Sequence, residues 1–162
     1  MLNTLRKRLQ GEEGFTLVEL LVVILIIGIL AAIAIPSFLN QKGKGEDAAA
    51  KSSAREAATA VETWYTDNGN YNATGAQLRV IEASLLGDAG AACAAGTKSS
   101  ACAGTMKVTP INGGADGYQI TAFSKPSGRP YTITKDNSQN PPVNSRTCAP
   151  ANEGGCNNTG SW

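Results

Sequence analysis

The apolar residues of this chain are concentrated in one unbroken stretch near its N-terminus. From Phe15 to Ile35 the sequence holds a single charged side chain, that of Glu19. At a rise of about 1.5 Å per residue, a helix over this stretch is about 31 Å long, enough to cross a hydrocarbon core of about 30 Å. Because the stretch is apolar on every face, it is unlike the half-buried helix of a soluble domain. We therefore predict a transmembrane helix over residues 15–35, followed by a polar remainder.

Two residues weaken this helix, and two glycines beyond it mark the end of the membrane stem. Gly28 lowers helix propensity by about 1 kcal/mol relative to Ala. Pro36 removes one backbone hydrogen bond at a cost of about 3 kcal/mol or more. We expect the helix to break or kink at these positions and to resume over residues 36–67 as a stem that continues into the head. The segment Lys42-Gly43-Lys44-Gly45 is the expected juncture of stem and head.

Helical periodicity returns strongly in the second half of the stem, where apolar residues recur every three or four positions. A stripe made mostly of alanine permits the close approach of a packing partner. We interpret that partner as the sheet of the chain's own head, although a helix that binds another protein has the same pattern. Turn residues at 67–70 end the helix. The stripe consists of Ala50, Ala54, Ala57, Val61 and Trp64.

Residues 68–162 have the pattern of a small α+β head. The sequence Thr74-Gly75-Ala76-Gln77 has the form of a capping box and predicts a short helix. Three later segments alternate apolar and polar positions, as antiparallel strands with one face on a core do. We therefore expect an α+β fold in which the long N-terminal helix packs on a three-stranded antiparallel meander. The expected strands are Thr105–Ile111, Gly117–Ser124 and Arg129–Lys135.

The residues ahead of the apolar stretch indicate its orientation and leave three alternative fates. The run Arg6-Lys7-Arg8 places residues 1–14 in the cytoplasm and the long C-terminal part across the membrane. The stretch is then a permanent signal anchor, a cleaved secretory signal peptide, or a segment that is processed and retained. The small residues of Ala32-Ile33-Ala34 fit signal peptidase cleavage, but Glu19 and the length of the stretch argue against it.

The third alternative rests on a motif. Gly14-Phe15-Thr16-Leu17-Val18-Glu19, followed by the apolar stretch and Pro36, resembles the class III signal of the type IV pilin family, and the resemblance extends from Gly11 to about Gln41. It implies that a prepilin peptidase cleaves between Gly14 and Phe15, that Phe15 is then N-methylated, and that the apolar helix is kept. The resemblance also implies the pilin fold, which agrees with the α+β head expected above.

Glu19 is the residue for which the resemblance implies a role in assembly. An ionised carboxylate in a lipid-embedded helix costs about 2.5–3.5 kcal/mol. A carboxylate near the helix end also reaches the interface or takes up a proton, so the charge alone decides nothing. After cleavage, the α-amino group of Phe15 lies one helical turn away and pairs with Glu19 of the same chain or of a neighbour. The resemblance favours the neighbour, which sets the axial offset of an incoming subunit, and it implies that Gly28–Pro36 loses helical hydrogen bonds in the filament.

Composition excludes most enzyme classes and one class of binding protein. Lys and Arg number 14 against 13 Asp and Glu, a net charge of +1, so bulk charge does not support nucleic-acid binding. The absence of histidine removes Ser-His-Asp and Cys-His pairs and every His-ligated metal site. The head's carboxylates Asp116, Asp136 and Glu153 are scattered. We predict no enzyme activity, no cofactor and no metal site.

The four cysteines are expected to form two disulfides, because an exported head is oxidised and their spacing does not match a zinc ribbon. We favour Cys93–Cys102 and Cys148–Cys156, since short loops of small residues close easily. A crossed pairing, which ties the loop after Gly87 to the tail, stays open and gains more from loop closure. Either pairing would hold a tail, residues 136–162, that has few apolar groups.

Together with the resemblance, these patterns predict a structural subunit: a major pilin that polymerises with itself, with a prepilin peptidase and the pilus assembly machinery as partners. Its precursor is expected in the cytoplasmic membrane and its mature form in a surface pilus that serves twitching motility, adhesion or DNA uptake. The alternatives are the major pseudopilin of a type II secretion system, a minor pilin, and a membrane-anchored or secreted binding module that does not polymerise.

Overall fold

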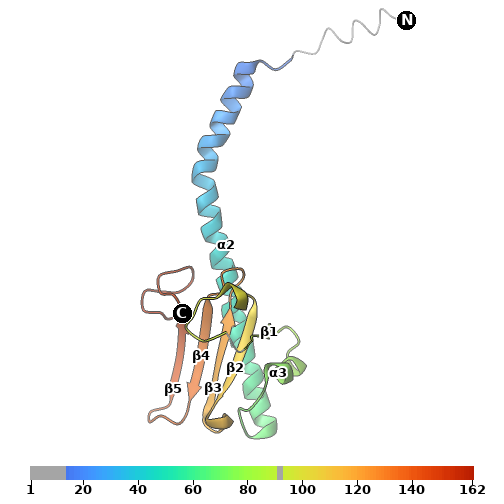
Figure 1. Cartoon of the computed structure of the whole chain (residues 1–162), viewed down its shortest axis with the longest axis vertical. Helices are drawn as coiled ribbons and strands as arrows, with labels where there is room; N and C mark the ends of the chain where they lie inside the picture. Colours follow the sequence, from blue (N-terminus) through green and yellow to red (C-terminus); the bar gives the residue numbers. More distant parts are fainter. Residues whose placement is uncertain (1–13, 91–92) are drawn as a thin grey trace, which may run out of the picture. The chain divides into compact units, whose positions relative to one another are not determined.

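The computed structural model describes residues 14–90 and 93–162 (Figure 1). Residues 1–13, which carry the predicted leader charges, lie outside the described residues. The chain divides into two compact units between Leu39 and Asn40. This boundary lies just before Lys42–Gly45, the expected juncture of stem and head.

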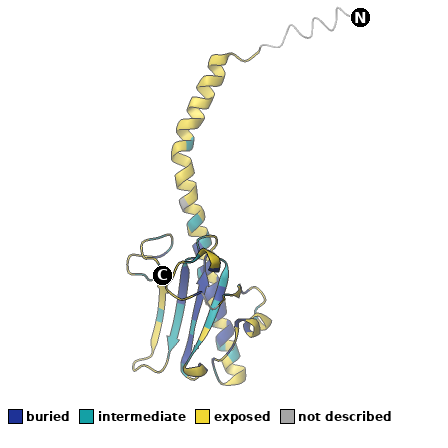
Figure 2. Cartoon of the chain, in the orientation of Figure 1, coloured by how far each residue is buried: buried dark blue, intermediate teal, exposed yellow. Residues whose placement is uncertain are grey.

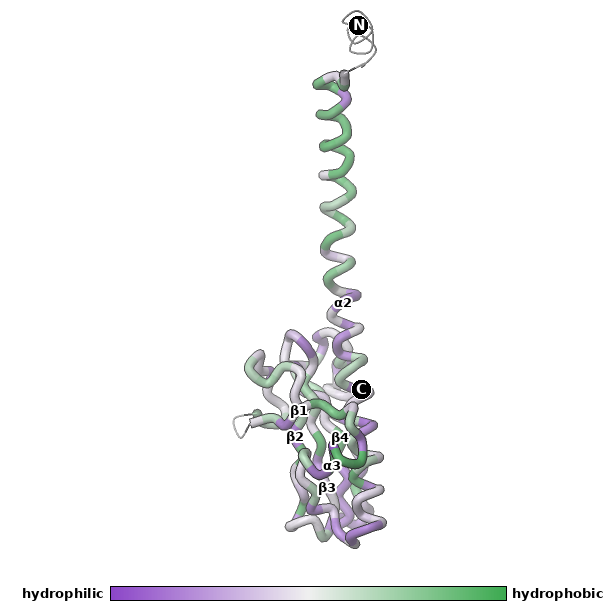
Figure 3. Tube along the Cα trace, turned by 90° about the vertical axis from the view of Figure 1, so that its right-hand side faces the viewer, coloured by the Kyte–Doolittle hydropathy of each residue, from purple (hydrophilic) through white to green (hydrophobic). Residues whose placement is uncertain are grey.

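Helix α2 (Leu17–Asn68) contains both the apolar stretch and the stem. In the first unit its large apolar side chains are exposed, from Leu17 at 78% to Leu39 at 60%. Figure 3 shows this part of α2 as mainly hydrophobic. Among the described helices, α2 is the one long and apolar enough to cross a membrane. Such a surface is stabilised by lipid or by other apolar helices, and not by water.

A break at Gly28 and Pro36 is wrong for the single chain, while a kink there stays a prediction. Helix α2 continues through both residues, and also through Gly43 and Gly45. A proline removes one hydrogen bond of the helix, while the bonds on either side persist and carry the helix across it. The propensity cost of about 1 kcal/mol per glycine is likewise small beside the cooperativity of a long helix. A loss of helical hydrogen bonds in a filament stays a prediction.

The alanine stripe of α2 packs on the sheet of the head. Ala54, Ala57 and Val61 are fully buried and share one core with Ile120 and Tyr131 of the sheet. Figure 2 shows the buried residues gathered on the head part of α2 and on the middle strands. The interpretation that the stripe serves the chain's own sheet is confirmed.

The sheet has five strands in the order β1-β2-β3-β4-β5, with β1 parallel to β2 and all other neighbours antiparallel. The three strands predicted from alternation are β2, β3 and β4, and their ends shift by no more than one residue. The predicted α+β class is therefore confirmed. The strands are β1 (Gly87–Asp88), β2 (Thr105–Ile111), β3 (Gly117–Phe123), β4 (Pro130–Asp136) and β5 (Val143–Cys148).

The predicted strand number is wrong, because a strand forms at each edge of the meander. Strand β5 lies in the tail, and pairs with β4 from Asp136 opposite Val143 to Tyr131 opposite Cys148. Most of its side chains are exposed on both faces. Backbone hydrogen bonds hold such a strand, and no alternation of apolar and polar side chains reports them.

The short helix α3 (Gly75–Ile81) begins at the predicted capping box. The Thr74 hydroxyl accepts a hydrogen bond from the Gln77 N–H at 3.3 Å, and the Gln77 side-chain oxygen accepts one from the Thr74 N–H at 2.9 Å. Leu78 is fully buried and fixes the helix on the core. Two 3₁₀ turns, η1 (Ser100–Cys102) and η2 (Asn112–Gly114), flank β2.

Candidate functional site

Two side chains close the N-terminal end of α2 reciprocally. The Thr16 hydroxyl oxygen accepts a hydrogen bond from the Glu19 N–H at 3.2 Å. In return, Glu19 Oε2 accepts bonds from the Thr16 N–H at 3.0 Å and from the Thr16 hydroxyl at 2.9 Å. This arrangement is a capping box, and it places a carboxylate at the positive end of the helix dipole. Glu19 therefore stabilises the start of α2.

The cap is absent from the sequence predictions, although the spacing of Thr16 and Glu19 ahead of an apolar run is its signal. Gly14 and Phe15 precede the helix, and the Phe15 side chain is 88% exposed. The peptide bond between them is thus flanked by accessible residues. Cleavage at that bond and methylation of Phe15 stay predictions.

The apolar part of α2 has a shallow hollow of about 540 Å³ around Gly28. A Cβ atom at Gly28 would meet no heavy atom within 4 Å, so the chain's own packing does not require a glycine there. A hollow between ridges is the feature into which side chains of another helix pack. Its lining residues are Leu21, Ile24, Leu25, Gly28, Ile29 and Ala32.

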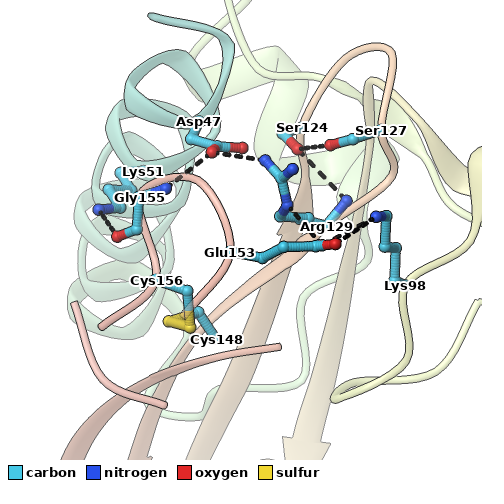
Figure 4. A network of polar contacts seen from close by, with 10 residues as sticks. All are labelled: Asp47, Lys51, Lys98, Ser124, Ser127, Arg129, Cys148, Glu153, Gly155 and Cys156. Atoms are coloured by element: carbon cyan, nitrogen blue, oxygen red, sulfur yellow. Dashed lines mark hydrogen bonds and ion pairs between the residues drawn. A yellow bond between two sulfur atoms is a disulfide. The ribbon is translucent and has the colours of Figure 1, made fainter. Parts of the chain in front are cut away.

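In the head, the buried carboxylate of Asp47 joins α2 by an ion pair to Arg129 and by a hydrogen bond to the tail (Figure 4). Asp47 Oδ2 accepts hydrogen bonds from Arg129 Nη1 at 2.8 Å and from the Gly155 N–H at 2.9 Å. Lys51, one turn further along α2, donates to the Gly155 carbonyl at 2.6 Å. Asp47 is fully buried, and its second oxygen has no partner among the described residues. A buried charge of this kind depends strongly on its one cation.

The same arginine links a second carboxylate into the network. Arg129 Nε donates to Glu153 Oε2 at 3.1 Å, and Lys98 Nζ donates to the same oxygen at 2.8 Å. The hydrogen bonds from Lys98 and then from Arg129 hold the pKa of Glu153 below its ordinary value. The network thus ties the tail both to α2 and to the loop that precedes β2.

The N-terminal segment that contains the cap and the exposed Phe15 is similar to known proteins. Residues 9–35 match the family described as the prokaryotic N-terminal methylation motif. The type IV major fimbrial protein FimA of Dichelobacter nodosus is 33% identical over 135 residues, covering 76% of this chain and 80% of that protein. The chain belongs to the type IV pilin family.

Two further relatives of this pilin differ in how much of them it spans. The type IV major pilin protein PilA of Myxococcus xanthus is 41% identical over 61 residues, which cover 38% of this pilin but 28% of that protein. The type II secretion system core protein G of Pseudomonas aeruginosa is 27% identical over 154 residues, which cover 93% of this pilin and 95% of that protein. No solved structure matches the chain significantly.

The pilin's four cysteines form the disulfides Cys93–Cys102 and Cys148–Cys156, the pairing favoured from loop length. The second closes the loop whose Glu153 and Gly155 join the ion network. Beyond that loop, Ser161 pairs with Thr147 on the outer edge of β5. The tail is therefore held by a strand and an ion network as well as by the expected disulfide.

A second polar cluster crosses the head of the pilin under α2. Glu62 Oε1 accepts hydrogen bonds from Lys135 Nζ at 2.8 Å and from the Tyr118 hydroxyl at 3.0 Å. Lys135 Nζ also donates to the Tyr71 hydroxyl at 3.0 Å. Burial, and then the nearby Glu62 charge, raise the pKa of Tyr118. The phenol therefore stays a neutral donor, and the cluster fixes the end of α2 on β3 and β4.

Within residues 14–90 and 93–162, no group of three or more Cys, Asp or Glu side chains is arranged to hold a metal ion. The relatives are named as a major fimbrial protein and as a core protein of a type II secretion system. The features with functional weight are thus the apolar helix with its cap and hollow, and the surfaces of the head.

Proposed function

We propose that this pilin is the major subunit of a type IV pilus, cleaved by a prepilin peptidase between Gly14 and Phe15, methylated at Phe15, and polymerised through its apolar helix. One observation carries the proposal: the first unit presents an unbroken apolar surface of exposed side chains, with a carboxylate at its start. Such a surface is stable in a bilayer and equally in a bundle of like helices. Exchange of lipid for helix contacts therefore moves a subunit into a filament at low cost.

The geometry of Glu19 supports its role in that exchange. The two cap bonds that the Glu19 carboxylate accepts both use Oε2, which leaves Oε1 to accept from the α-amino group of a neighbour's Phe15. Pairing of these two charges offsets the desolvation of both. One axial offset is thereby favoured over all others. The hollow at Gly28 offers an adjacent place for a neighbour's apolar side chain.

The proposed function is structural and includes no enzyme activity. The precursor resides in the cytoplasmic membrane, and the mature subunit in an extracellular pilus that acts in twitching motility, adhesion or DNA uptake. A second candidate, the major pseudopilin of a type II secretion system, is favoured by the match to core protein G over nearly the whole of both chains.

Mass spectrometry of the mature N-terminus, combined with electron microscopy of sheared surface fibres, tests the proposal. A methylated Phe15 in a subunit recovered from long surface fibres supports it. An intact Met1 points to an uncleaved anchor and an N-terminal Ile35 to an ordinary signal peptide, and either overturns it. A methylated Phe15 without surface fibres, in cells that secrete through a type II system, favours the pseudopilin.

A further inference from the structure

Two grooves flank the exposed ridge of α2 in the head. The first, about 560 Å³, lies between α2 and strands β3 to β5. The second, about 260 Å³, lies between α2 and the end of α3. Thr59 lines both, so one ridge of the helix separates them. Since consecutive helix residues are turned by about 100°, the neighbours Arg55 and Glu56 fall on opposite flanks of this ridge.

The first groove, here called the basic groove, carries unpaired positive charge. Arg55 of α2 and Arg146 of β5 line it, and neither forms an ion pair with a described carboxylate. Their guanidinium carbons lie 5.1 and 5.6 Å from the centre of the Trp162 ring, which holds both at the groove. The third cation, Lys135, is neutralised by Glu62 at 2.8 Å. Two cations therefore remain to meet a partner.

The second groove, here called the acidic groove, carries unpaired negative charge. Glu56 and Glu82 line it, no Lys or Arg does, and neither carboxylate forms an ion pair within the described ranges. The Ser84 hydroxyl lies 2.8 Å from Glu82 Oε1 and 3.5 Å from Glu56 Oε2, so both carboxylates converge on one point. The adjacent apolar side chains Val80 and Ile81 are 87% and 40% exposed.

We propose that the basic groove of one copy binds the acidic groove of a second copy of this chain. The grooves match in chemistry: two cations and two carboxylates that lack ion-pair partners among the described residues face each other. The exposed Val80 and Ile81 meet the half-buried Ala58 and Ile133 in the lining of the basic groove. Complementary charge of this kind sets register and partner choice. The contact rests on the proposed filament and specifies how its heads pack.

The topology of the head places the two grooves so that copies join in an open series. Strand β5 forms one edge of the sheet, while α3 packs against β1 and β2 at the other (Figure 1). The two grooves lie on the two flanks of α2, so a contact between unlike grooves leaves a free basic groove at one end of any pair of copies and a free acidic groove at the other. Such a heterologous contact continues from copy to copy, as a helical filament requires, when the rotation between copies does not close a ring.

Charge reversal in the full-length chain, in cells that produce the filament, tests the contact. Arg146→Glu and Glu82→Arg are each expected to lower filament yield about tenfold or more, because each places like charges face to face. The double variant is expected to return to within about twofold of wild type. Co-production of the two single variants should also restore filaments, because alternating copies again oppose unlike charges. Lys125→Glu is the matched control: it reverses an exposed lysine that lines neither groove, and should keep wild-type yield.

The level and disulfide state of each variant in the membrane show that it folds. Wild-type yields from both single variants overturn the contact. Losses that neither the double variant nor co-production restores overturn it as well, since they show no pairing of these charges. A loss confined to Arg146→Glu assigns the basic groove to a different acidic partner and also overturns it. If the wild-type chain itself forms no filaments, the proposed function is refuted. That outcome differs from the preceding ones, which refute only the contact between the grooves.

Discussion

Arg129 Nη1 lies 2.8 Å from Asp47 Oδ2, and the two side chains are 14% and 1% exposed. This pair joins the start of β4 to α2 across a separation of 82 residues. Because the same Asp47 oxygen accepts from Gly155, three segments that are distant in sequence meet at one carboxylate. This buried charge therefore contributes to holding the tail on the head, together with β5 and the Cys148–Cys156 disulfide.

Replacement of Asp47 tests that contribution. Asp47→Ala is expected to lower the free energy of unfolding of the head by about 3–5 kcal/mol, because it leaves the Arg129 guanidinium without its buried partner. Chemical denaturation of the full chain in detergent, followed by tryptophan fluorescence, measures the loss. Glu46→Ala is the matched control: its partner Lys42 is 63% exposed and their ion pair spans 4.0 Å, so less than about 1 kcal/mol is expected from the loss of that pair. Equal losses in the two variants would contradict the assignment.

Acid is expected to loosen the tail through Glu153. Its folded pKa lies below the ordinary value of 4.5 because Lys98 and Arg129 donate to the ionised carboxylate. The stabilisation is therefore complete above the unfolded pKa, and is lost as pH falls through the lower folded value. The protection of amides 149–156 against hydrogen exchange, corrected for the intrinsic rate at each pH, should fall as pH is lowered below about 4.5. Glu153→Gln should already exchange faster at neutral pH and show a flatter acid dependence; an unchanged profile would refute the role of this carboxylate.

The elements foreseen from sequence are those that side-chain periodicity encodes. The alanine stripe, the capping box at Thr74 and the three central strands all place a recognisable residue type at a regular interval, and the structure has them within a residue. The apolar stretch is foreseen for the same reason. The continuity of α2 through Pro36 is not predicted from sequence, because helix propensities are summed residue by residue while helix formation is cooperative.

The remaining features depend on contacts that no local pattern contains. Strand β5 is held by backbone bonds to β4, so its polar side chains give no signal. In the sequence, Asp47 cannot be distinguished from an exposed acidic residue on a helix surface. Only the folded structure brings Arg129 to it. The two grooves likewise form only when α2 packs against β3 to β5 on one flank and against the end of α3 on the other. The cap of Glu19 differs from these cases, since the spacing of Thr16 and Glu19 is visible in the sequence, where the motif predicts processing and assembly but not the cap.

Removal of the tail disulfide is expected to release β5. The double replacement Cys148→Ser and Cys156→Ser should lower the free energy of unfolding by about 2–4 kcal/mol, because the unfolded tail regains its freedom. Hydrogen exchange in Val143–Cys148 should rise most, since this edge strand pairs with β4 on one side and with Ser161 on the other. Emission from Trp162, which packs edge-on against Tyr131, should shift to the red.

The other disulfide supplies the control for that experiment. Cys93 and Cys102 pack with Phe123 in a separate small cluster, apart from the main core. Their double replacement by Ser is expected to destabilise the loop before β2 while β5 keeps its slow exchange. If both double replacements raised hydrogen exchange in β5 equally, the order of the tail would depend on the overall stability of the head and not on the Cys148–Cys156 disulfide.

The two functions of Glu19, as helix cap and as charge, are separable by substitution. Glu19→Gln keeps a capping side chain, because an amide oxygen also accepts from the Thr16 N–H, but it removes the charge that a neighbour's α-amino group would meet. Thr16→Ala keeps the charge and removes the hydroxyl partner, at about 1 kcal/mol of helix stability. If the charge governs assembly, filament yield should fall at least about tenfold in Glu19→Gln and stay near wild type in Thr16→Ala. Quantitative immunoblots of sheared fibres against the membrane pool measure both, with N-terminal mass spectrometry to show that processing is intact. Equal losses would assign the effect to the cap, and wild-type yield from Glu19→Gln would leave the carboxylate without a part in assembly.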